Sequence, residues 1–310
     1  MKLRRQHQTT VDIFDKPTPL FDKFNAWKVG TPFGGGILII GIVSIVFLWS
    51  IGIFNIQINH WELFTILFTF ISFGVLGLFD DAKKLAGKPE KYFLLGLRFR
   101  YKFVIQWILA LIPATILYFQ LNYTFLFIKG IGLADIGFLY IPFAAFVIVS
   151  FANAFNIADG LDGLSPGLLL ICLVAFLAIS FTNLDQGLGV FIAILMGSVA
   201  AFLYFNIYKA RLWLGDVGSL SLGASLAIIG LLTGKTLAIV VIGGVFVLEV
   251  GSSLIQILGK KFLHKKIFPV APLHLYFLQR GWDEPKIVMR GWLFGVFFAI
   301  LGLYIAFFDK

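Results

Sequence analysis

Charged residues are scarce in this chain of 310 residues: Asp, Glu, Lys and Arg together make up 13% of it, and only 16 residues are acidic. Hydrophobic residues account for 59%, and the mean hydropathy is +0.94. This composition excludes a soluble globular domain of this length. The long unbroken apolar runs also exclude a transmembrane β-barrel, whose strands alternate in polarity. We therefore predict an all-α polytopic membrane protein, since helices satisfy their own backbone hydrogen bonds in lipid.

Cysteine is almost absent. Cys172 is the single cysteine and lies inside an apolar run, so no intrachain disulfide can form. We expect it to be a small buried hydrophobic residue. A cleavable signal peptide is not expected either, because residues 1–34 are polar and mixed in charge. No fixed-period repeat or low-complexity linker divides the chain, which favours one integral-membrane domain over residues 1–310.

The apolar runs predict about nine transmembrane helices, each long enough for a hydrocarbon core of roughly 30 Å. We expect them near residues 35–54, 63–79, 103–119, 138–155, 166–182, 188–207, 218–233, 237–258 and 291–308. The seventh is short and contains glycine, so we expect it to be broken or buried by its neighbours.

The distribution of Lys and Arg predicts the orientation. With the N-terminus in the cytoplasm, 22 of the 25 basic residues fall in inner segments and only Lys129, Lys235 and Lys310 fall outside. This predicts a cytoplasmic N-terminal segment 1–34, a cytoplasmic loop 259–290 and an extracytoplasmic C-terminus. The net charge of +9 is then mainly a signal of topology, and nucleic-acid binding is not expected.

Several acidic residues fall at the predicted cytoplasmic ends of spans. Asp80 and Asp81 follow the second span, where two adjacent carboxylates would oppose the helix dipole and each other. Metal or proton chemistry is the favoured interpretation, and an interfacial pair held by Lys83 and Lys84 is the structural alternative. Acidic residues at membrane depth are costly and usually functional.

A second polar run recurs every three residues: Asn153, Asn156, Asp159 and Asp162. It predicts a stripe or loop of convergent oxygen atoms, with a polar lead-in to the fifth span as the alternative. Asp216 opens the seventh span, where it could equally be a helix N-cap or a site residue.

Other candidates are weaker when taken alone. Lys28 precedes a glycine-rich segment that could hold phosphate or serve as a flexible entry loop. Glu249 lies within a span, and pairing inside the bundle is favoured for it. Trp213 could lie at the membrane interface or stack on a base. The lone His274 is more often a structural than a catalytic residue, and the histidine spacing does not predict a zinc site.

Taken together, these motifs resemble the polyprenyl-phosphate N-acetylhexosamine-1-phosphate transferase superfamily, and within it the phospho-N-acetylmuramoyl-pentapeptide transferase family. The superfamily pattern is carried by Asp80-Asp81 with Lys84, by Asn153 to Leu164 and by Gly215 to Ser219. The narrower resemblance lies in Gly30-Thr31-Pro32, in Gly243 to Glu249, and in Arg280 to Lys286 followed by Arg290.

The resemblance implies transfer of a phosphosugar from a UDP-sugar, UDP-N-acetylmuramoyl-pentapeptide, to a polyprenyl (undecaprenyl) phosphate. UMP would leave and lipid I would form, at the cytoplasmic face of a bacterial plasma membrane. It also implies that Asp80, Asp81 and Asp216 are catalytic, with Mg²⁺ held by Asp216 and with Asp80 favoured over Asp81 as the base or positioner of the lipid phosphate. Contact with membrane lipids and a homodimer are implied as well. The implied substrate-binding residues are Lys28, Lys84, Asn153, Asn156, Asp159, Asp162, Asn206, Trp213 and His274.

Two departures from the family pattern leave other interpretations open. Residues 1–34 are too polar for the extra N-terminal span of relatives, and Leu275 and Tyr276 replace the histidines that follow His274 in them. The lost histidines favour UDP-N-acetylglucosamine as an alternative donor, whereas the block from Arg280 to Arg290 opposes it. A cation-coupled transporter is the alternative from another class, although no paired halves are visible.

Overall fold

The computed structural model describes residues 30–86, 99–128 and 132–307. Lys28 lies outside these residues. Within them, eight helices are long and apolar enough to cross a membrane, and a bent pair of helices brings the number to nine. The prediction of a polytopic helical membrane protein is therefore confirmed, with each predicted span lying on a helix or on the bent pair.

The elements follow the chain from end to end. The long helices are α2 (Gly35–Phe54), α3 (His60–Ala86), α4 (Phe99–Phe119), α5 (Tyr140–Ala158), α6 (Leu164–Thr182), α7 (Gln186–Asn206), α8 (Gly215–Leu232), α10 (Gly244–Phe262) and α12 (Glu284–Phe307). The shorter elements are strands β1 (Phe125–Ile128) and β2 (Gly132–Asp135), the 3₁₀-helix η2 (Gly137–Leu139), and helices α9 (Thr236–Ile242) and α11 (Leu273–Gln279).

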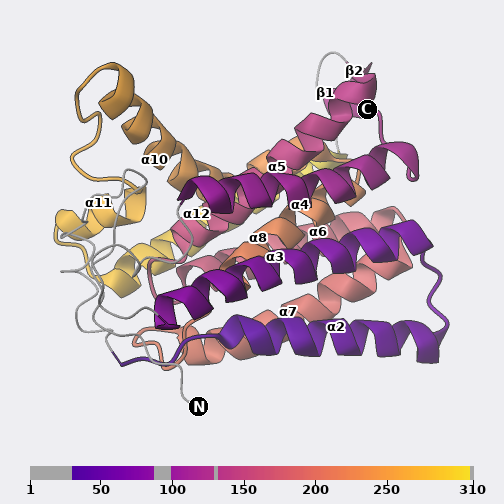
Figure 1. The fold of residues 1–310 in the computed structure, drawn as a ribbon, viewed down its shortest axis with the longest axis horizontal. Helices are drawn as coiled ribbons and strands as arrows, with labels where there is room; N and C mark the ends of the chain where they lie inside the picture. Colours follow the sequence, from indigo (N-terminus) through magenta and orange to yellow (C-terminus); the bar gives the residue numbers. More distant parts are fainter. Residues whose placement is uncertain (1–29, 87–98, 129–131, 308–310) are drawn as a thin grey trace.

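Most long helices run side by side across the view of Figure 1, with α10 and α11 at one end and the β1–β2 hairpin at the other. The hairpin is antiparallel, with Phe125 paired with Asp135, and the apolar pattern did not predict it. The peripheral helices α2 and α12 expose large apolar side chains such as Ile45 and Leu293, at 69% and 70%. Such outward apolar faces are expected of helices that face lipid.

Helix α8 is the central element. It is unbroken, and 89% of its residues are buried, as expected of a short span enclosed by neighbours. Small residues make this possible because they let helix backbones approach closely. A Cβ atom on Gly36 of α2, for example, would lie 2.3 Å from the Cα of Gly218 in α8.

The structure corrects the prediction of one continuous span over 237–258. This segment forms α9 and α10, which meet at an angle of 78°. The bend falls at Gly243 and Gly244, and the space that their side chains would fill is taken by the rings of Phe151 and Phe298. A glycine pair is a usual site for a sharp helix bend.

Helix α3 also differs from the prediction, because it continues through Asp80 and Asp81 to Ala86. Its 27 residues correspond to about 40 Å, which exceeds the apolar thickness of a bilayer. The two aspartates therefore do not lie at a helix C-terminus. They lie on the last turns of a helix that is longer than its apolar part.

Candidate active site

Close contact between α3 and α8 brings the acidic residues together. A Cβ atom on Gly77 would lie 2.1 Å from the backbone oxygen of Asp216, so only glycine fits there without displacing α8. Asp80 and Asp81 follow Gly77 by three and four residues, which places them on the same helix face one turn later. The start of α8 therefore lies directly beside both aspartates.

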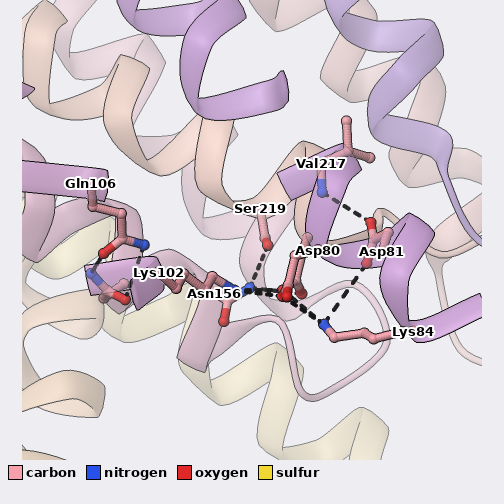
Figure 2. A network of polar contacts seen from close by, with 10 residues as sticks. Asp80, Asp81, Lys84, Lys102, Gln106, Asn156, Val217 and Ser219 are labelled. Atoms are coloured by element: carbon pink, nitrogen blue, oxygen red, sulfur yellow. Dashed lines mark hydrogen bonds and ion pairs between the residues drawn. The ribbon is translucent and has the colours of Figure 1, made fainter. Parts of the chain in front are cut away.

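Two lysine side chains, Lys84 and Lys102, lie beside Asp80 (Figure 2), and both also contact Asp216. Lys84 Nζ lies 3.1 Å from Asp80 Oδ2 and 2.8 Å from Asp216 Oδ2. Lys102 Nζ, from the first turn of α4, lies 3.0 Å and 2.6 Å from the same two oxygens. The cluster therefore has three carboxylates, if Asp81 is included, and two ammonium groups drawn from α3, α4 and α8.

The cluster is more open on one side than on the other. The side chains of Asp80 and Asp81 are 4% and 9% exposed, whereas that of Lys84 is 34% exposed. Those of Lys102 and Asp216 are intermediate at 14% and 18%. A ligand from solution would therefore meet the lysines and Asp216 before the two aspartates of α3.

Asp81 supports the N-terminus of α8. Its Oδ2 accepts a hydrogen bond of 3.1 Å from the backbone N–H of Val217, while the N-cap residue of α8, Leu214, makes no side-chain cap. Gly215, which has a φ of 78°, leaves room for this carboxylate, because a Cβ there would lie 2.7 Å from Asp81 Oδ2. Asp216 itself is directed to the lysines, so the interpretation of Asp216 as an ordinary N-cap is wrong.

Two asparagines of α5 extend the network, of which Asn156 is labelled in Figure 2. Asn156 Nδ2 donates to Asp216 Oδ1 at 3.2 Å and to Ser219 Oγ at 2.6 Å. Asn153 lies one turn before Asn156 on α5, where it exchanges hydrogen bonds with the buried Gln106 of α4. Asn156 of the predicted stripe thus touches the carboxylate cluster.

The remaining residues of that stripe organise a neighbouring loop. The hydroxyl of Ser165 donates to Asp159 Oδ1, and the backbone N–H of Ala210 donates to Asp162 Oδ2 at 3.0 Å. Asn206 Oδ1 accepts from the N–H of Gly163 at 3.0 Å. The bonds from Ala210 and to Asn206 hold the α5–α6 loop against the end of α7 and the α7–α8 loop.

His274 pairs with Glu249, which confirms the favoured interpretation of that glutamate. Nδ1 of His274 lies 3.0 Å from Oε2 of Glu249, and both residues are buried. The other ring nitrogen has no hydrogen-bond partner among the described residues, and it lies 2.6 Å from the Cβ position of Gly160. This pair therefore joins α10 and α11 to the loop that holds Asp159.

Trp213 is half-buried beside the segment that precedes α2. The backbone N–H of Trp213 donates a hydrogen bond to the backbone oxygen of Pro32. The backbone oxygen of Trp213 accepts one from the backbone N–H of Gly35, and each bond measures 2.9 Å. The glycine-rich entry segment is thereby attached to the turn just before Asp216. The position of Lys28 is outside the described chain.

Lys102 and Gln106 belong to this network but were not predicted from the sequence, and Ser219, which ends the motif from Gly215, was not assigned to the site. From the sequence, Lys102 is predicted only to contribute to the orientation, as one of the 22 basic residues on the inner side. The available signal was the spacing of Lys102 and Gln106, which are four residues apart and therefore share one face of an otherwise apolar helix.

The cluster is chemically suited to a charged ligand. With all five side chains ionised, three carboxylates and two ammonium groups leave one net negative charge in a largely buried place. Buried ion pairs cost desolvation energy and are weak evidence for stability. Ionisable groups at such a position are better explained by a site for a cation together with an anion such as phosphate.

Comparison with known proteins gives a consistent result. The profile of glycosyl transferase family 4 matches residues 63–234, a range that includes Asp80 and Asp216. The phospho-N-acetylmuramoyl-pentapeptide-transferase of Borrelia turicatae is 37% identical over 300 residues, covering 89% of this chain and 82% of that protein. The enzymes of the same name from Pelagibacter ubique and Oceanobacillus iheyensis are 35% and 37% identical, covering 80% and 84% of their own lengths. The chain belongs to the phospho-N-acetylmuramoyl-pentapeptide-transferase family of the family 4 glycosyl transferases.

Proposed function

We propose that this enzyme transfers phospho-N-acetylmuramoyl-pentapeptide from its UDP donor to undecaprenyl phosphate. The products are lipid I and UMP, and the reaction is the first membrane step of peptidoglycan synthesis. The observation that carries the proposal is the convergence of Asp80, Asp81 and Asp216 with Lys84 and Lys102 at one end of the helices. The printed names of the relatives supply the transferred group.

In the proposed reaction, an oxygen of the lipid phosphate attacks the β-phosphorus of the donor. The bond from that phosphorus to the oxygen of UMP breaks, so one diphosphate bond replaces another. Positioning and charge neutralisation are then the main tasks of the protein. Lys84 and Lys102 are assigned to the phosphate oxygens, and Asp80 to the orientation or deprotonation of the lipid phosphate.

The residues also fit a magnesium ion. Among the described residues, no group of three or more His, Cys, Asp or Glu is arranged to hold a metal by itself. Mg²⁺ in proteins is often held by one or two carboxylates together with substrate phosphates, and Asp216 is the ligand we assign, with Asp80 beside it. When bound, Mg²⁺ would neutralise charge on the diphosphate.

The other assigned residues surround this centre. Asp81 is assigned to holding the start of α8 in place, since its oxygen is already engaged by Val217. The substrate-binding set is completed by Lys28, Asn153, Asn156, Asp159, Asp162, Asn206, Trp213 and His274. The contacts of Asn156 with Asp216 and of the α5–α6 loop with the α7–α8 loop support this grouping.

The proposal also includes the cellular setting. The protein would act as one transferase domain in the bacterial plasma membrane, with the site at the cytoplasmic face and membrane lipids around its apolar helices. The preference of basic residues for the same face supports this orientation. A homodimer is carried over from the family resemblance.

Identification of the lipid product tests the function. Purified enzyme would be incubated with Mg²⁺, undecaprenyl phosphate and either the UDP-N-acetylmuramoyl-pentapeptide or UDP-N-acetylglucosamine, and the lipids analysed by mass spectrometry. We expect lipid I from the first donor only. A lipid-linked N-acetylglucosamine phosphate as the sole product would support the second candidate, which Leu275 and Tyr276 beside His274 favour. Nucleotide-sugar uptake into vesicles without UMP release would support a transporter instead.

A further inference from the structure

A cavity of about 560 Å³ lies outside the carboxylate cluster, where the α7–α8 loop meets the start of α12. Two of its lining residues are cationic, Lys286 and Arg290, and both side chains are exposed. The complete lining is Tyr208, Asp283, Pro285, Lys286, Met289 and Arg290. None of these lining residues is assigned to catalysis or to the metal.

Among the described residues, the two cations have no carboxylate partner, and both lie against the ring of Trp282. They lie four residues apart on α12, a spacing at which like charges repel. Both lie over the ring of Trp282, with Lys286 Nζ at 5.1 Å and the guanidinium carbon of Arg290 at 4.3 Å from its centroid. No ion pair of either residue, including one with the nearby Asp283, is present in the described part of the chain. Such a pair is arranged to receive an anion, and an arginine favours a planar carboxylate.

The cavity adjoins the proposed donor site through the α5–α6 loop. Glu284, between two lining residues, accepts a hydrogen bond of 2.6 Å from the N–H of Asp162. The carboxylate of Asp162 in turn accepts from Ala210, two residues beyond the lining residue Tyr208. A donor held at Asn156 and Asp159 could therefore extend past Asp162 toward Lys286 and Arg290.

We infer that Lys286 and Arg290 form a subsite for a carboxylate of the donor's peptide, and that Trp282 keeps the two cations in position. The inference rests on the proposed function, which supplies a donor with a pentapeptide. Any such peptide with a free C-terminus carries at least one carboxylate. The subsite would give the enzyme a means to prefer a peptide-bearing donor over an unmodified UDP-sugar.

The test compares two donors in two enzymes. One donor carries the free C-terminal carboxylate and the other carries a C-terminal amide, and each is assayed with the full-length enzyme and with its K286Q/R290Q variant. With the wild-type enzyme, we expect amidation to raise the donor KM about fivefold, a modest effect because the cations are solvent-exposed. In the variant, the two donors should have equal KM values. If the subsite binds a side-chain carboxylate of the peptide, amidation of that side chain, and not of the C-terminus, should raise the donor KM. Donors with amidated side chains are therefore assayed in the same way.

Matched variants separate this subsite from general electrostatics. The K260Q/K261Q variant removes two exposed cations from the end of α10 in the same predicted cytoplasmic segment, and it should leave the carboxylate preference intact. The K286R variant should retain the preference as well. Thermal unfolding of each purified variant identifies any loss of fold.

Three results would overturn the inference. One is a donor KM in the wild-type enzyme that changes neither when the C-terminal carboxylate is amidated nor when the side-chain carboxylates of the peptide are amidated. Another is an increase in the KM of undecaprenyl phosphate, or in the requirement for anionic lipid, as the only effect of K286Q/R290Q, which would make the two residues lipid-headgroup contacts. The third is an inert peptide donor alongside active UDP-N-acetylglucosamine, which would overturn the proposed function and this subsite with it. The first two results leave the proposed function intact.

Discussion

Asp81 of α3 caps a helix to which it does not belong: its Oδ2 lies 3.1 Å from the backbone nitrogen of Val217 in α8. The neighbouring Asp80 instead contacts two lysines through its Oδ2. Lys84 lies near both aspartates, 3.1 Å from Asp80 Oδ2 and 3.9 Å from Asp81 Oδ1, but Asp81 also accepts the hydrogen bond from Val217. One holds the start of α8, and the other faces the charged cluster, so their substitutions should have different consequences.

Substitution of Asp81 should affect stability according to whether an acceptor oxygen remains. We expect Asp81→Ala to destabilise the protein by about 1 kcal/mol, the usual effect of losing a helix cap. Asp81→Asn retains a side-chain oxygen that can accept from Val217, so its thermal unfolding midpoint should stay near that of the wild type. The measurement is thermal unfolding in detergent. Equal destabilisation by the two changes would contradict the capping role.

The close approach of α3 and α8 predicts a strong effect for a very small change. In Gly77→Ala, the added methyl group would lie 2.1 Å from the backbone oxygen of Asp216, so α3 and α8 must move apart. Overpacking of this kind costs about 1–3 kcal/mol, and it should also reduce activity by displacing Asp216 from Asp80. Unfolding midpoint and UMP release would both be measured.

Gly197→Ala in α7 is the matched control for Gly77→Ala, because among the described residues no atom outside its own stretch of helix lies within 4 Å of its Cβ position. This change should leave activity unchanged, and it should be neutral or slightly stabilising, since alanine favours helix more than glycine does. A Gly77→Ala enzyme as active as the Gly197→Ala enzyme would show that the contact of α3 with α8 does not set the site geometry.

Lys102 should be as important as the residues that the sequence motifs identified. Its Nζ lies 2.6 Å from Asp216 and 3.0 Å from Asp80, and we assign it to the phosphate oxygens of the donor. Loss of a donor to developing charge commonly lowers kcat by about 100-fold or more, and we expect this of Lys102→Gln. Lys102→Arg should recover part of the activity because it keeps the charge. A kcat near the wild-type value in Lys102→Gln would remove this residue from the mechanism.

The sequence predicted much of the fold because a bilayer allows few solutions: apolar runs of sufficient length must be helices. The bend at Gly243 was not predicted, since hydropathy does not distinguish a straight helix from a broken one. The contact of Lys102 with Asp216 was missed for a different reason. Its partners, Asp80 and Asp216, lie 22 and 114 residues away in the sequence. These residues meet because α3, α4 and α8 pack together, and the sequence spacing does not show that packing. The motif residues Asp159 and Asp162 were predicted as site residues, but local spacing could not show that they would organise a loop beside the carboxylates.

Asp216 should determine the response to magnesium. We expect chelation of divalent metal to abolish UMP release, and Asp80→Asn and Asp216→Asn each to abolish transfer while the protein still inserts into membranes. Any residual activity of Asp216→Asn should require a higher Mg²⁺ concentration than the wild type, because a neutral amide is a weaker ligand than a carboxylate. Titration of activity against Mg²⁺ measures this. Full activity after chelation, or near-normal turnover in either variant, would exclude the corresponding role.

Trp213 should discriminate between the two substrates. Its backbone is fixed by Pro32 and Gly35, which holds the indole beside the turn that leads to Asp216. If the ring stacks on the uracil of the donor, Trp213→Ala loses an interaction that is typically worth about 1–3 kcal/mol per base. We therefore expect the KM of the UDP-sugar to rise by about tenfold, while the KM of undecaprenyl phosphate changes little. Trp213→Phe is the control, because it retains a ring that can stack, and it should show a smaller increase. An equal increase in both KM values would indicate that Trp213 serves the structure of the entry segment and not the recognition of the nucleotide.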